Sequence, residues 1–495
     1  MKIKKLLSAV LALSVCSSLF AGCANNNDSA EKDIRLKYVM AGAGMQPNSR
    51  EVWAVFNDKL HETLPNVTVD FEIIPLAEYK QKVMLMQSAR EQIDILNNYS
   101  LDFTTEINNG TFIALDDLLV EYGKEVKNAI PDWVWDYQVV NGKTYGIPTY
   151  QMMGQSRAIC TLKENADKYL DIDALRKALD SSPYLSEEVY KVLTEYCANA
   201  KADGLNFKSA SILNVGGYDT VSGMYGIIMD DEECRVVNTL VGDQAKIRFK
   251  TAREWVEKGY IRSDALSATD NDSYNGKKDG NLFWDENYSP YHADNLTKKY
   301  GAEVITIPYD TEPPIYHKAL AGGTSITSTC KYPKEAMQVL NLIQTDEEIY
   351  NLLVFGREGI DYKKISDNRI ETTYQGTATA NDGYGLKSWI VGNTELAYLT
   401  QSDPDNYKEY AFDEVNSSTN RSKLIGFQID TTKIVDMLSQ TNSIKGQYLQ
   451  PLNVGAVENW EENYNEFREK LKIAGEEEII AEIQKQVDEF LASKN

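Results

Sequence analysis

Aromatic and amide side chains gather in one short stretch of the chain, residues 281–300. Trp284, Asn287 and Tyr288 follow there after two apolar residues that are typical of a short strand. Aromatic rings cover apolar CH faces, whereas amides form hydrogen bonds with hydroxyl groups. The stretch therefore suits a ligand that carries both. The alternative is an aromatic surface loop that packs on its own lobe, because aromatic residues lie more often in cores than in sites.

A second stretch, residues 141–157, combines a turn signal with the same kinds of side chain. Asn141-Gly142 accepts the positive φ angles of a tight hairpin turn, and Pro148 biases the residue before it away from helix. We predict that the segment Tyr145–Pro148 is a hinge crossing, with an ordinary hairpin as the alternative. Three side chains after the proline are expected to face a ligand: Tyr150, Gln151 and Arg157.

These side chains need a scaffold, and the N-terminal part of the chain predicts one. Apolar residues alternate with charged ones over 34–40, recur at helical spacing over 52–60, and form further extended runs over 67–74 and 94–96. Strands that alternate with helices in this way indicate a parallel, doubly wound sheet. Ligands bind beyond the carboxyl ends of such strands, so the loop that follows the third strand should lie at a crevice. This places Tyr99 among the candidate contacts.

The alternation resumes in the second half of the chain. Helical spacing over 187–200 and 243–258 predicts a second α/β lobe. Near the C-terminus, apolar residues over 460–471 and 479–491 predict two amphipathic helices that dock on a lobe. The expected fold class is therefore α/β, with two doubly wound lobes, a multi-crossing hinge and a helical C-terminal extension.

Extended runs that end in proline or glycine mark the expected crossings between the lobes, at residues 147–150, 307–311 and 355–362. These crossings divide the chain into the two expected lobes. Lobe 1 is expected to contain residues 33–147 and 312–358, and lobe 2 residues 148–311 and 359–495.

Composition excludes several classes of function. The chain has 495 residues and a formal net charge of -23, so it lacks the excess of Lys and Arg that nucleic-acid binding needs. It has three His and no CxxC pair, which argues against zinc, and the spacing of a calcium loop over 270–282 fails at Leu282. We expect no metal and no cofactor. Four widely spaced cysteines favour separate buried thiols, with one or two disulfides as the alternative: Cys160, Cys197, Cys234 and Cys330.

Residues 1–22 have the pattern of an export signal. Three lysines precede an apolar run that is too short to span a membrane, and small residues come before Cys23. The segment Leu19–Cys23 (LFAGC) resembles a bacterial lipobox, although Phe20 stands where the usual pattern has Leu. The resemblance implies cleavage before Cys23, lipidation of its thiol (diacylglycerol, palmitate), and an anchored protein on the extracytoplasmic face of the cell membrane. Residues 23–32 are expected to form a polar tether.

Four segments of the chain, taken in order behind the lipobox, carry a resemblance to a known family. They are residues 141–148 (NGKTYGIP), 336–362 (AMQVLNLIQTDEEIYNLLVFGREGIDY), 389–393 (WIVGN) and 467–491 (FREKLKIAGEEEIIAEIQKQVDEFL). With them the chain resembles the family 1 extracellular solute-binding proteins of bacterial ABC importers, in the lipoprotein subgroup with a C-terminal domain of unknown function. The resemblance covers nearly the whole chain beyond the signal.

The resemblance implies a carbohydrate, expected to be an oligosaccharide, that is clamped between two lobes of a type II periplasmic-binding-protein-like fold. It also implies a monomer that delivers this ligand to the transmembrane permease of an ABC importer and is not an enzyme. The expected ligand contacts are Tyr99, Tyr150, Gln151, Arg157, Trp284, Asn287, Tyr288, Trp389 and Asn393. Two alternatives stay open: a surface glycan-binding sensor or adhesin, and a glycoside hydrolase, which would need two placed carboxylates.

Overall fold

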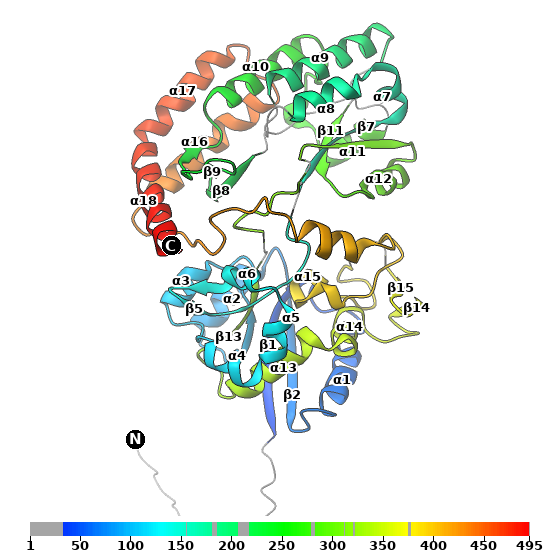
Figure 1. Ribbon diagram of the computed structural model, residues 1–495, viewed down its shortest axis with the longest axis vertical. Helices are drawn as coiled ribbons and strands as arrows, with labels where there is room; N and C mark the ends of the chain where they lie inside the picture. The colour runs from blue at the N-terminus through cyan, green and yellow to red at the C-terminus, as the bar shows by residue number, and fades with distance from the viewer. Residues whose placement is uncertain are drawn as a thin grey trace, which may run out of the picture.

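The computed structural model describes residues 33–494, except 155, 181–185, 206–216, 279–282, 311, 320–321 and 375–377. The expected signal peptide and tether, and with them Cys23, lie outside the described residues. Figure 1 shows two lobes, one above the other, that are joined by several extended segments. Among the helices described here, none combines the length and the apolar character that crossing a bilayer requires.

Lobe 1 is built on a five-stranded sheet. In spatial order the strands are β2 (Val67–Pro75), β1 (Ile34–Gly42), β3 (Ile95–Asn97), β13 (Gly323–Ile326) and β6 (Ile147–Pro148). Strand β1 is parallel to β2 and β3, whereas β13 is antiparallel to β3 and β6. The three predicted N-terminal strands are thus confirmed as parallel neighbours. Their carboxyl ends lie at the edge of the sheet that faces lobe 2 (Figure 1).

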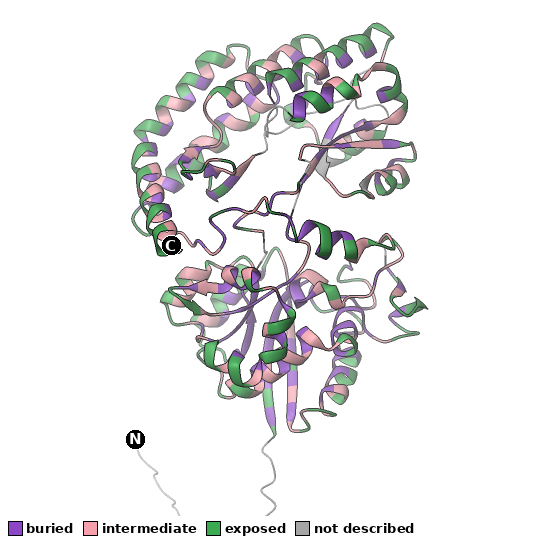
Figure 2. Cartoon of the chain, in the orientation of Figure 1, coloured by how far each residue is buried: buried purple, intermediate pink, exposed green. Residues whose placement is uncertain are grey.

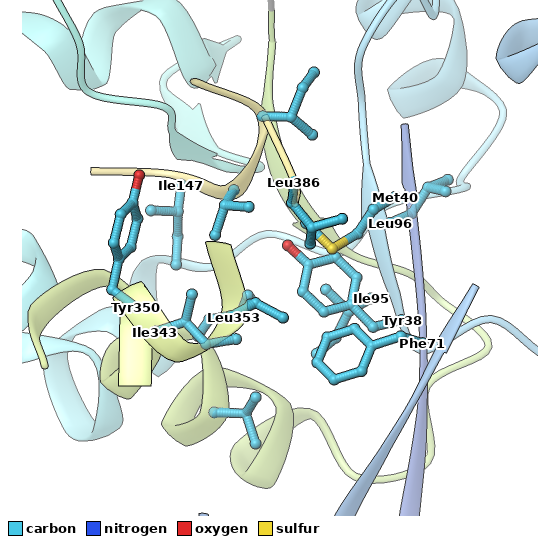
Figure 3. Close-up of a cluster of buried hydrophobic side chains, with 14 of the residues drawn as sticks. Tyr38, Met40, Phe71, Ile95, Leu96, Ile147, Ile343, Tyr350, Leu353 and Leu386 are labelled. Atoms are coloured by element: carbon cyan, nitrogen blue, oxygen red, sulfur yellow. The ribbon is translucent and has the colours of Figure 1, made fainter. Parts of the chain in front are cut away.

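Helices pack around this sheet and complete the core of lobe 1. Helix α1 (Ser49–Leu60) buries Val52, Phe56 and Leu60 at the predicted helical spacing. Figure 3 shows strand residues such as Tyr38 and Ile95 in one cluster with helical residues such as Leu353. The other helices of the lobe are α2 (Tyr79–Ser88), α3 (Phe103–Asn108), α4 (Asp116–Tyr122), α5 (Lys124–Ala129), α6 (Asp132–Trp135), α13 (Pro333–Thr345), α14 (Glu347–Phe355) and α15 (Ser388–Val391). Figure 2 shows that their outer faces are exposed and the sheet is buried.

Lobe 1 extends further along the chain than the sequence indicates. Tyr362, Ile370 and Phe412 belong to the same buried cluster as β1, which differs from the expected boundary at residue 358. The chain turns back after α14 because Arg357 and Asp361 form an ion pair, with Nε and Oδ2 2.8 Å apart. In the sequence, a local turn of this kind has the same glycine-containing pattern as a crossing between lobes, which explains the difference. The residues 355–362 are therefore part of lobe 1, followed by the hairpin of β14 (Tyr362–Ser366) and β15 (Arg369–Thr372).

In the described residues, lobe 2 contains two three-stranded antiparallel sheets, not the doubly wound sheet that we expect from the sequence. In one sheet β7 (Arg157–Leu162) lies between β11 (Trp284–Asn287) and β12 (Val304–Pro308). In the other β9 (Tyr225–Ile228) lies between β8 (Tyr218–Ser222) and β10 (Val236–Asn238). Helical periodicity between strands does not specify strand direction, which explains the difference. The helices are α7 (Lys163–Tyr169), α8 (Ile172–Asp180), α9 (Glu187–Ala202), α10 (Asp243–Glu257), α11 (Asp270–Lys278) and α12 (His292–Tyr300).

Helices α16 (Val435–Asn453), α17 (Trp460–Ile473) and α18 (Glu476–Lys494) form the C-terminal extension. They share a buried cluster with the sheet of β8, β9 and β10 and with α10, in which Phe249 meets Tyr464 at 5.9 Å between ring centroids. The two predicted amphipathic helices are confirmed as α17 and α18. The extension is therefore part of the core of lobe 2, along its outer side (Figure 1).

The Asn-Gly turn is confirmed and forms the hairpin that was the alternative, whereas the predicted hinge at Tyr145–Pro148 is wrong. Strands β4 (Val139–Val140) and β5 (Lys143–Thr144) pair across Asn141 and Gly142, whose φ angles are 52° and 73°. The chain then enters the lobe 1 sheet as β6, so Tyr145–Pro148 belongs to lobe 1 and the first crossing follows it. Two further crossings join the lobes at 309–322 and 416–434, where Ile315 and Arg421 form a β-bridge.

The cysteines that the structure describes are separate thiols, as the sequence favours. Cys160, Cys197 and Cys234 are buried in three different core clusters, and Cys330 lies half-buried beside the core of lobe 1. The segment 270–282, whose spacing partly fits a calcium loop, begins with helix α11, in which Asp272 accepts hydrogen bonds from Thr269. Its last residues, 279–282, lie outside the described part of the chain.

Candidate functional site

Buried amides hold the carboxyl edge of the lobe 1 sheet. Asn97 Nδ2 donates to the carbonyl of Gly323 at 3.1 Å, and Asn98 Nδ2 donates to Gln138 Oε1 at 2.9 Å. Asn98 Oδ1 accepts from the N–H of Gly323 at 2.5 Å. A buried amide must find such partners because it loses its hydrogen bonds to water. The loop after β3, which the sequence places at a crevice, is therefore fixed in position.

A cavity of about 430 Å³ opens beside this network, between the two lobes. Its walls come from lobe 1, from the crossings at 309–322 and 416–434, and from β8 of lobe 2. They include Asn98, Asp102, Gln138, His317, Lys318, Ser222 and Gln428. Two aromatic residues of lobe 1, Phe103 and Tyr137, also line it. The volume lies within the range of roughly 300–1,000 Å³ that is usual for small-ligand sites. The cavity thus offers amides, charged groups and rings to one ligand.

His317 is fixed in the cavity wall by Asp219 of β8. The backbone N–H of His317 donates to Asp219 Oδ2 at 3.0 Å, and Nδ1 lies 2.6 Å from Oδ1. The side chains are 1% and 2% exposed. Burial alone would raise the pKa of Asp219, but the hydrogen bonds from His317 and Ser422 hold this pKa below its ordinary value. The carboxylate is therefore ionised and accepts a hydrogen bond from Nδ1–H.

Lys318 ties the same crossing to lobe 2. Its Nζ donates to the carbonyl of Val221 in β8. Burial lowers the pKa of Lys318, because an ammonium group loses hydration in the wall of the cavity, while the negative charge of Asp219 opposes this change. The dipeptide His317-Lys318 therefore joins the second crossing to one strand of lobe 2 and presents two polar groups to the cavity.

Tyr99 and Trp389 are brought together on lobe 1. Their rings pack edge to face with centroids 5.8 Å apart, and Tyr99 also meets Tyr79 at 6.2 Å. Both predicted contacts are half-buried against the core of lobe 1. Helix α15, which carries Trp389, lies on the side of lobe 1 that faces lobe 2 (Figure 1). Tyr99 stands between two cavity-lining residues, Asn98 and Ser100.

Tyr150 and Asn393 are buried parts of the lobe 1 frame. Tyr150 is 5% exposed, and its ring packs against Phe412 at 5.1 Å between centroids. Asn393 is 3% exposed; its N–H donates to Gln344 Oε1 at 2.7 Å, and its Oδ1 accepts from the N–H of Glu395 at 3.1 Å. In this arrangement of the lobes their side chains support neighbouring segments and do not form an exposed surface.

The predicted contacts of the 281–300 stretch separate in the structure. Trp284 is 5% exposed and packs edge to face on Tyr300, with centroids 5.4 Å apart, inside lobe 2. Tyr288 is half-buried, and its N–H donates to the carbonyl of Ser156 at 2.9 Å. The backbone of Asn287 pairs with Arg157 in the sheet, whereas its side chain lies outside what the structure describes.

Gln151 and Arg157 mark the two ends of the first crossing. Gln151 is half-buried, and its carbonyl accepts from Asn416 Nδ2 at 2.9 Å. Arg157 begins β7 and is also half-buried. Burial raises the pKa of Tyr316 in the second crossing, and the positive charge of Arg157 opposes this rise. Arg157 therefore lies near the place where the crossings run side by side.

Sequence reasoning missed the polar residues of the second crossing and those opposite it. His317, Lys318 and Gln138 stand outside the aromatic-rich stretches that drew attention in the sequence. A signal was present, since two charged or titratable residues follow the proline-containing segment Pro313–Tyr316, just beyond the crossing expected at 307–311. The loop after β3, which we expect at a crevice because it follows the carboxyl end of a strand, does contribute Asn98 to the cavity wall.

Comparison with known proteins places this architecture among solute-binding folds. Residues 423–492, which include α16, α17 and α18 as far as residue 492, match the model of a domain of unknown function, DUF3502. Over 97% of its length the chain is 23% identical to a carbohydrate ABC transporter substrate-binding protein of Streptococcus pneumoniae serotype 4, with 96% of that protein covered.

Solved structures share the fold. The N-glycan transport solute binding protein NgtS from Streptococcus pneumoniae overlaps with a TM-score of 0.76 at 22% identity, covering 93% of this chain and 100% of that chain. NgtS in complex with Man1GlcNAc and with Man5GlcNAc gives 0.65 and 0.61. An HMO binding ABC-transporter associated solute binding protein from Bifidobacterium longum infantis gives 0.58 at 14% identity, covering 94% and 100%. The expected two-lobed α/β fold with a helical extension is confirmed.

Proposed function

We propose that this protein is the substrate-binding component of a carbohydrate ABC importer, which captures an oligosaccharide between its lobes and delivers it to the permease. The cavity that both lobes line is the observation that carries the proposal. A ligand that contacts both lobes favours the closed arrangement, because only differential affinity shifts such an equilibrium. The similarity over nearly the whole chain to a carbohydrate substrate-binding protein supports the same class of ligand.

The walls of the cavity suit a saccharide. Phe103 and Tyr137 supply rings that can cover the CH face of a sugar, and the amides of Asn98, Gln138 and Gln428 can pair with its hydroxyls. Closure takes those hydroxyls out of water, so each needs a partner in the site. A micromolar complex requires about 8 kcal/mol, which a few such contacts can supply.

Movement of the lobes follows from the crossings. The chain passes between the lobes at 149–156, 309–322 and 416–434, and the described residues of these segments can absorb a rotation while each lobe keeps its own core. The overlap with NgtS is greater for the structure described without a glycan than for the two glycan complexes. This difference supports an arrangement of the lobes that changes when a glycan binds.

Further contacts for a longer glycan come from half-buried residues around the crossings. Tyr99 and Trp389 on lobe 1, Tyr288 on lobe 2, and Gln151 and Arg157 at the first crossing remain our candidates. The buried residues act indirectly, by supporting these segments. They are Tyr150, Trp284 and Asn393. We also propose Asn287 as a ligand contact, from its place in β11.

The lipid anchor and the location rest on the N-terminal sequence. Cys23 follows an export signal and a lipobox-like segment, so the mature chain would be tethered to the extracytoplasmic face of the cell membrane. Replacing the thiol by a hydroxyl removes the group that accepts the lipid. Cys23→Ser should therefore release the protein into the medium, measured by immunoblotting of membrane and medium fractions. Retention of Cys23→Ser on membranes would contradict the anchor.

The experiment for the main proposal is calorimetric titration of the protein lacking residues 1–22 with Man1GlcNAc, Man5GlcNAc and kestose, followed by product analysis. We expect at least one glycan to bind and to be recovered unchanged. Turnover of a glycan would replace the proposal by the hydrolase alternative. Absence of binding to all three, together with binding of a non-carbohydrate solute, would overturn it. Neighbouring permease genes distinguish an importer from a sensor or adhesin.

A further inference from the structure

One nitrogen of a cavity-lining residue has no partner in the described part of the chain. Nε2 of His317 is buried and makes no hydrogen bond with the residues that the structure describes, although the opposite side of the same ring is bound to Asp219. The side chain is 1% exposed, so bulk water does not satisfy this atom. Nearly all buried polar groups in folded proteins are paired, and one that is not calls for an explanation. His317 lines the cavity, which is the place from which a partner can come.

The geometry turns the unpaired nitrogen away from Asp219. Both Asp219 oxygens are occupied by His317, one by its backbone N–H and one by Nδ1, and Asp219 does not line the cavity. Nε2 lies on the other edge of the imidazole ring. Two residues that follow Asp219 along β8, Val221 and Ser222, line the cavity. Asp219 therefore holds one edge of the ring, and Nε2 lies buried on the other edge of a residue that lines the cavity.

We infer that Nε2 of His317 is a hydrogen-bonding partner for a hydroxyl group of the bound saccharide, and that Asp219 orients the ring for this contact. The ionised carboxylate accepts a hydrogen bond from Nδ1–H, which leaves Nε2 as the ring nitrogen that can pair with a ligand hydroxyl. Lys318, next in the chain, adds donors on the same wall. The inference rests on the proposed function, because it names a residue that recognises the ligand of that cavity.

Two variants of His317 distinguish the contribution of Nδ1 to glycan binding from that of Nε2. In His317→Asn the side-chain amide can still donate to Asp219 from the position of Nδ1, but nothing replaces Nε2. In His317→Gln the amide reaches the position of Nε2. We expect His317→Asn to bind Man5GlcNAc about tenfold more weakly than the wild type, and His317→Gln to recover most of that loss. His61→Asn is the matched control, since His61 lies at the end of α1 and pairs with Thr68.

A second measurement does not depend on any variant. The chain has three histidines, so ¹⁵N-histidine labelling gives three imidazole rings to follow by NMR. Addition of Man5GlcNAc to the wild-type protein should shift the Nε2 resonance of His317 and leave that of His61 unchanged. This readout holds even where His317→Asn folds poorly.

The outcomes are distinct. Weaker binding by His317→Asn at an unchanged melting temperature, with a shifted Nε2 resonance in the wild type, supports the inference. Wild-type affinity in His317→Asn with an unmoved resonance overturns it, because the bound glycan then makes no contact with that nitrogen. In that case the proposed function stands, since the wild type still binds. Failure of the wild-type protein to bind any glycan overturns both.

Discussion

Trp284 and Tyr300 pack edge to face in the interior of lobe 2, with their ring centroids 5.4 Å apart. Trp284 is 5% exposed in this pair, and its cluster includes Ala158 and Val304 of the adjacent strands. The aromatic stretch at 281–300 thus joins two kinds of residue: a core tryptophan, and Tyr288, which stays half-buried near the first crossing.

Trp284→Ala is expected to act on stability. Removal of a buried Trp side chain costs about 3–5 kcal/mol, because the transfer free energy is lost and a cavity remains. The free energy of unfolding of lobe 2, measured by denaturant titration, should fall by this amount. Glycan affinity, measured well below the melting temperature, should change less than about threefold, a free-energy difference below 1 kcal/mol.

The matched variant is Trp389→Ala on lobe 1, where the indole is half-buried and lies against Tyr99. Here we expect the larger effect on affinity and the smaller effect on unfolding. A tenfold loss of affinity in Trp284→Ala without loss of stability would reverse this assignment and return Trp284 to the binding surface.

Asp361→Asn should destabilise lobe 1 by about 3 kcal/mol, because it breaks a buried ion pair and leaves Arg357 without its carboxylate. Burial alone would raise the pKa of Asp361, but Arg357 and Asn48 hold it below its ordinary value of 3.8. The stabilisation is therefore complete above pH 3.8 and is lost as the pH falls below it. The difference from the wild type in free energy of unfolding should shrink in that range.

The control for this pair is Asp70→Asn, which removes an exposed ion pair with Arg35 on the same lobe. Exposed pairs contribute about 0–1 kcal/mol, so this variant should unfold nearly as the wild type does. Equal losses in Asp361→Asn and Asp70→Asn would mean that burial does not strengthen the Arg357–Asp361 pair.

Asp310→Asn is expected to stabilise the protein at neutral pH. Burial raises the pKa of Asp310 to about 6, and the negative charge of Asp230 adds to this, although the Ser156 hydroxyl opposes it. The folded state thus holds the proton more tightly than the unfolded chain, and stability is lost as the pH rises from 3.8 to about 6. Above that range the variant should gain about 1–2 kcal/mol, less than the full difference in pKa implies, because Asp310 is partly exposed.

This gain should be visible in thermal unfolding at pH 7.5 and absent at pH 4. The exposed Asp58→Asn on α1 is the control, and it should change the free energy of unfolding by less than about 0.5 kcal/mol at both pH values. A gain for Asp310→Asn that is equal at both pH values would show that the effect is not the ionisation of the carboxyl group.

Gly392→Ala tests the segment 389–393, which carried part of the family resemblance. A Cβ on Gly392 would lie 2.0 Å from Nε2 of Gln344, whose amide binds the carbonyl of Val391 and the N–H of Asn393. That buried amide cannot move without losing both hydrogen bonds, so we expect a loss of about 2–3 kcal/mol in denaturant titration. Gly110→Ala is the control, because a Cβ there would meet nothing within 4 Å. Only the strain of its positive φ angle remains, so the free energy of unfolding should fall by about 1 kcal/mol.

Local signals in the sequence predicted local structure well. Asn141-Gly142 specified its hairpin, the apolar spacing specified α1, α17 and α18, and the order of strands and helices specified the parallel half of the lobe 1 sheet. Such patterns report a period and a turn, which the residues themselves determine.

Pairings between distant segments were not predictable in the same way. The insertion of β13 between β3 and β6, the contact of Asp219 with His317 across 98 residues, and the return of Phe412 to lobe 1 depend on tertiary packing. An aromatic residue has the same sequence pattern in a core as in a site, which is why Trp284 and Tyr150 were expected at the ligand. Burial of Tyr150 depends on Phe412, more than 200 residues away, and that of Trp284 on Tyr300 and on residues of the paired strand β7.

The place of β13 in the lobe 1 sheet also sets an order of events during folding. Thr324 pairs with Asn97 on one side and with Ile147 on the other, and its hydroxyl lies 3.2 Å from that of Tyr38, a residue 286 positions earlier. The sheet is completed after most of lobe 2 has been synthesised. Closing so long a loop is slow, because its entropy must be lost before distant contacts form. The sheet of lobe 1 should therefore be completed late, although its first strand leads the chain.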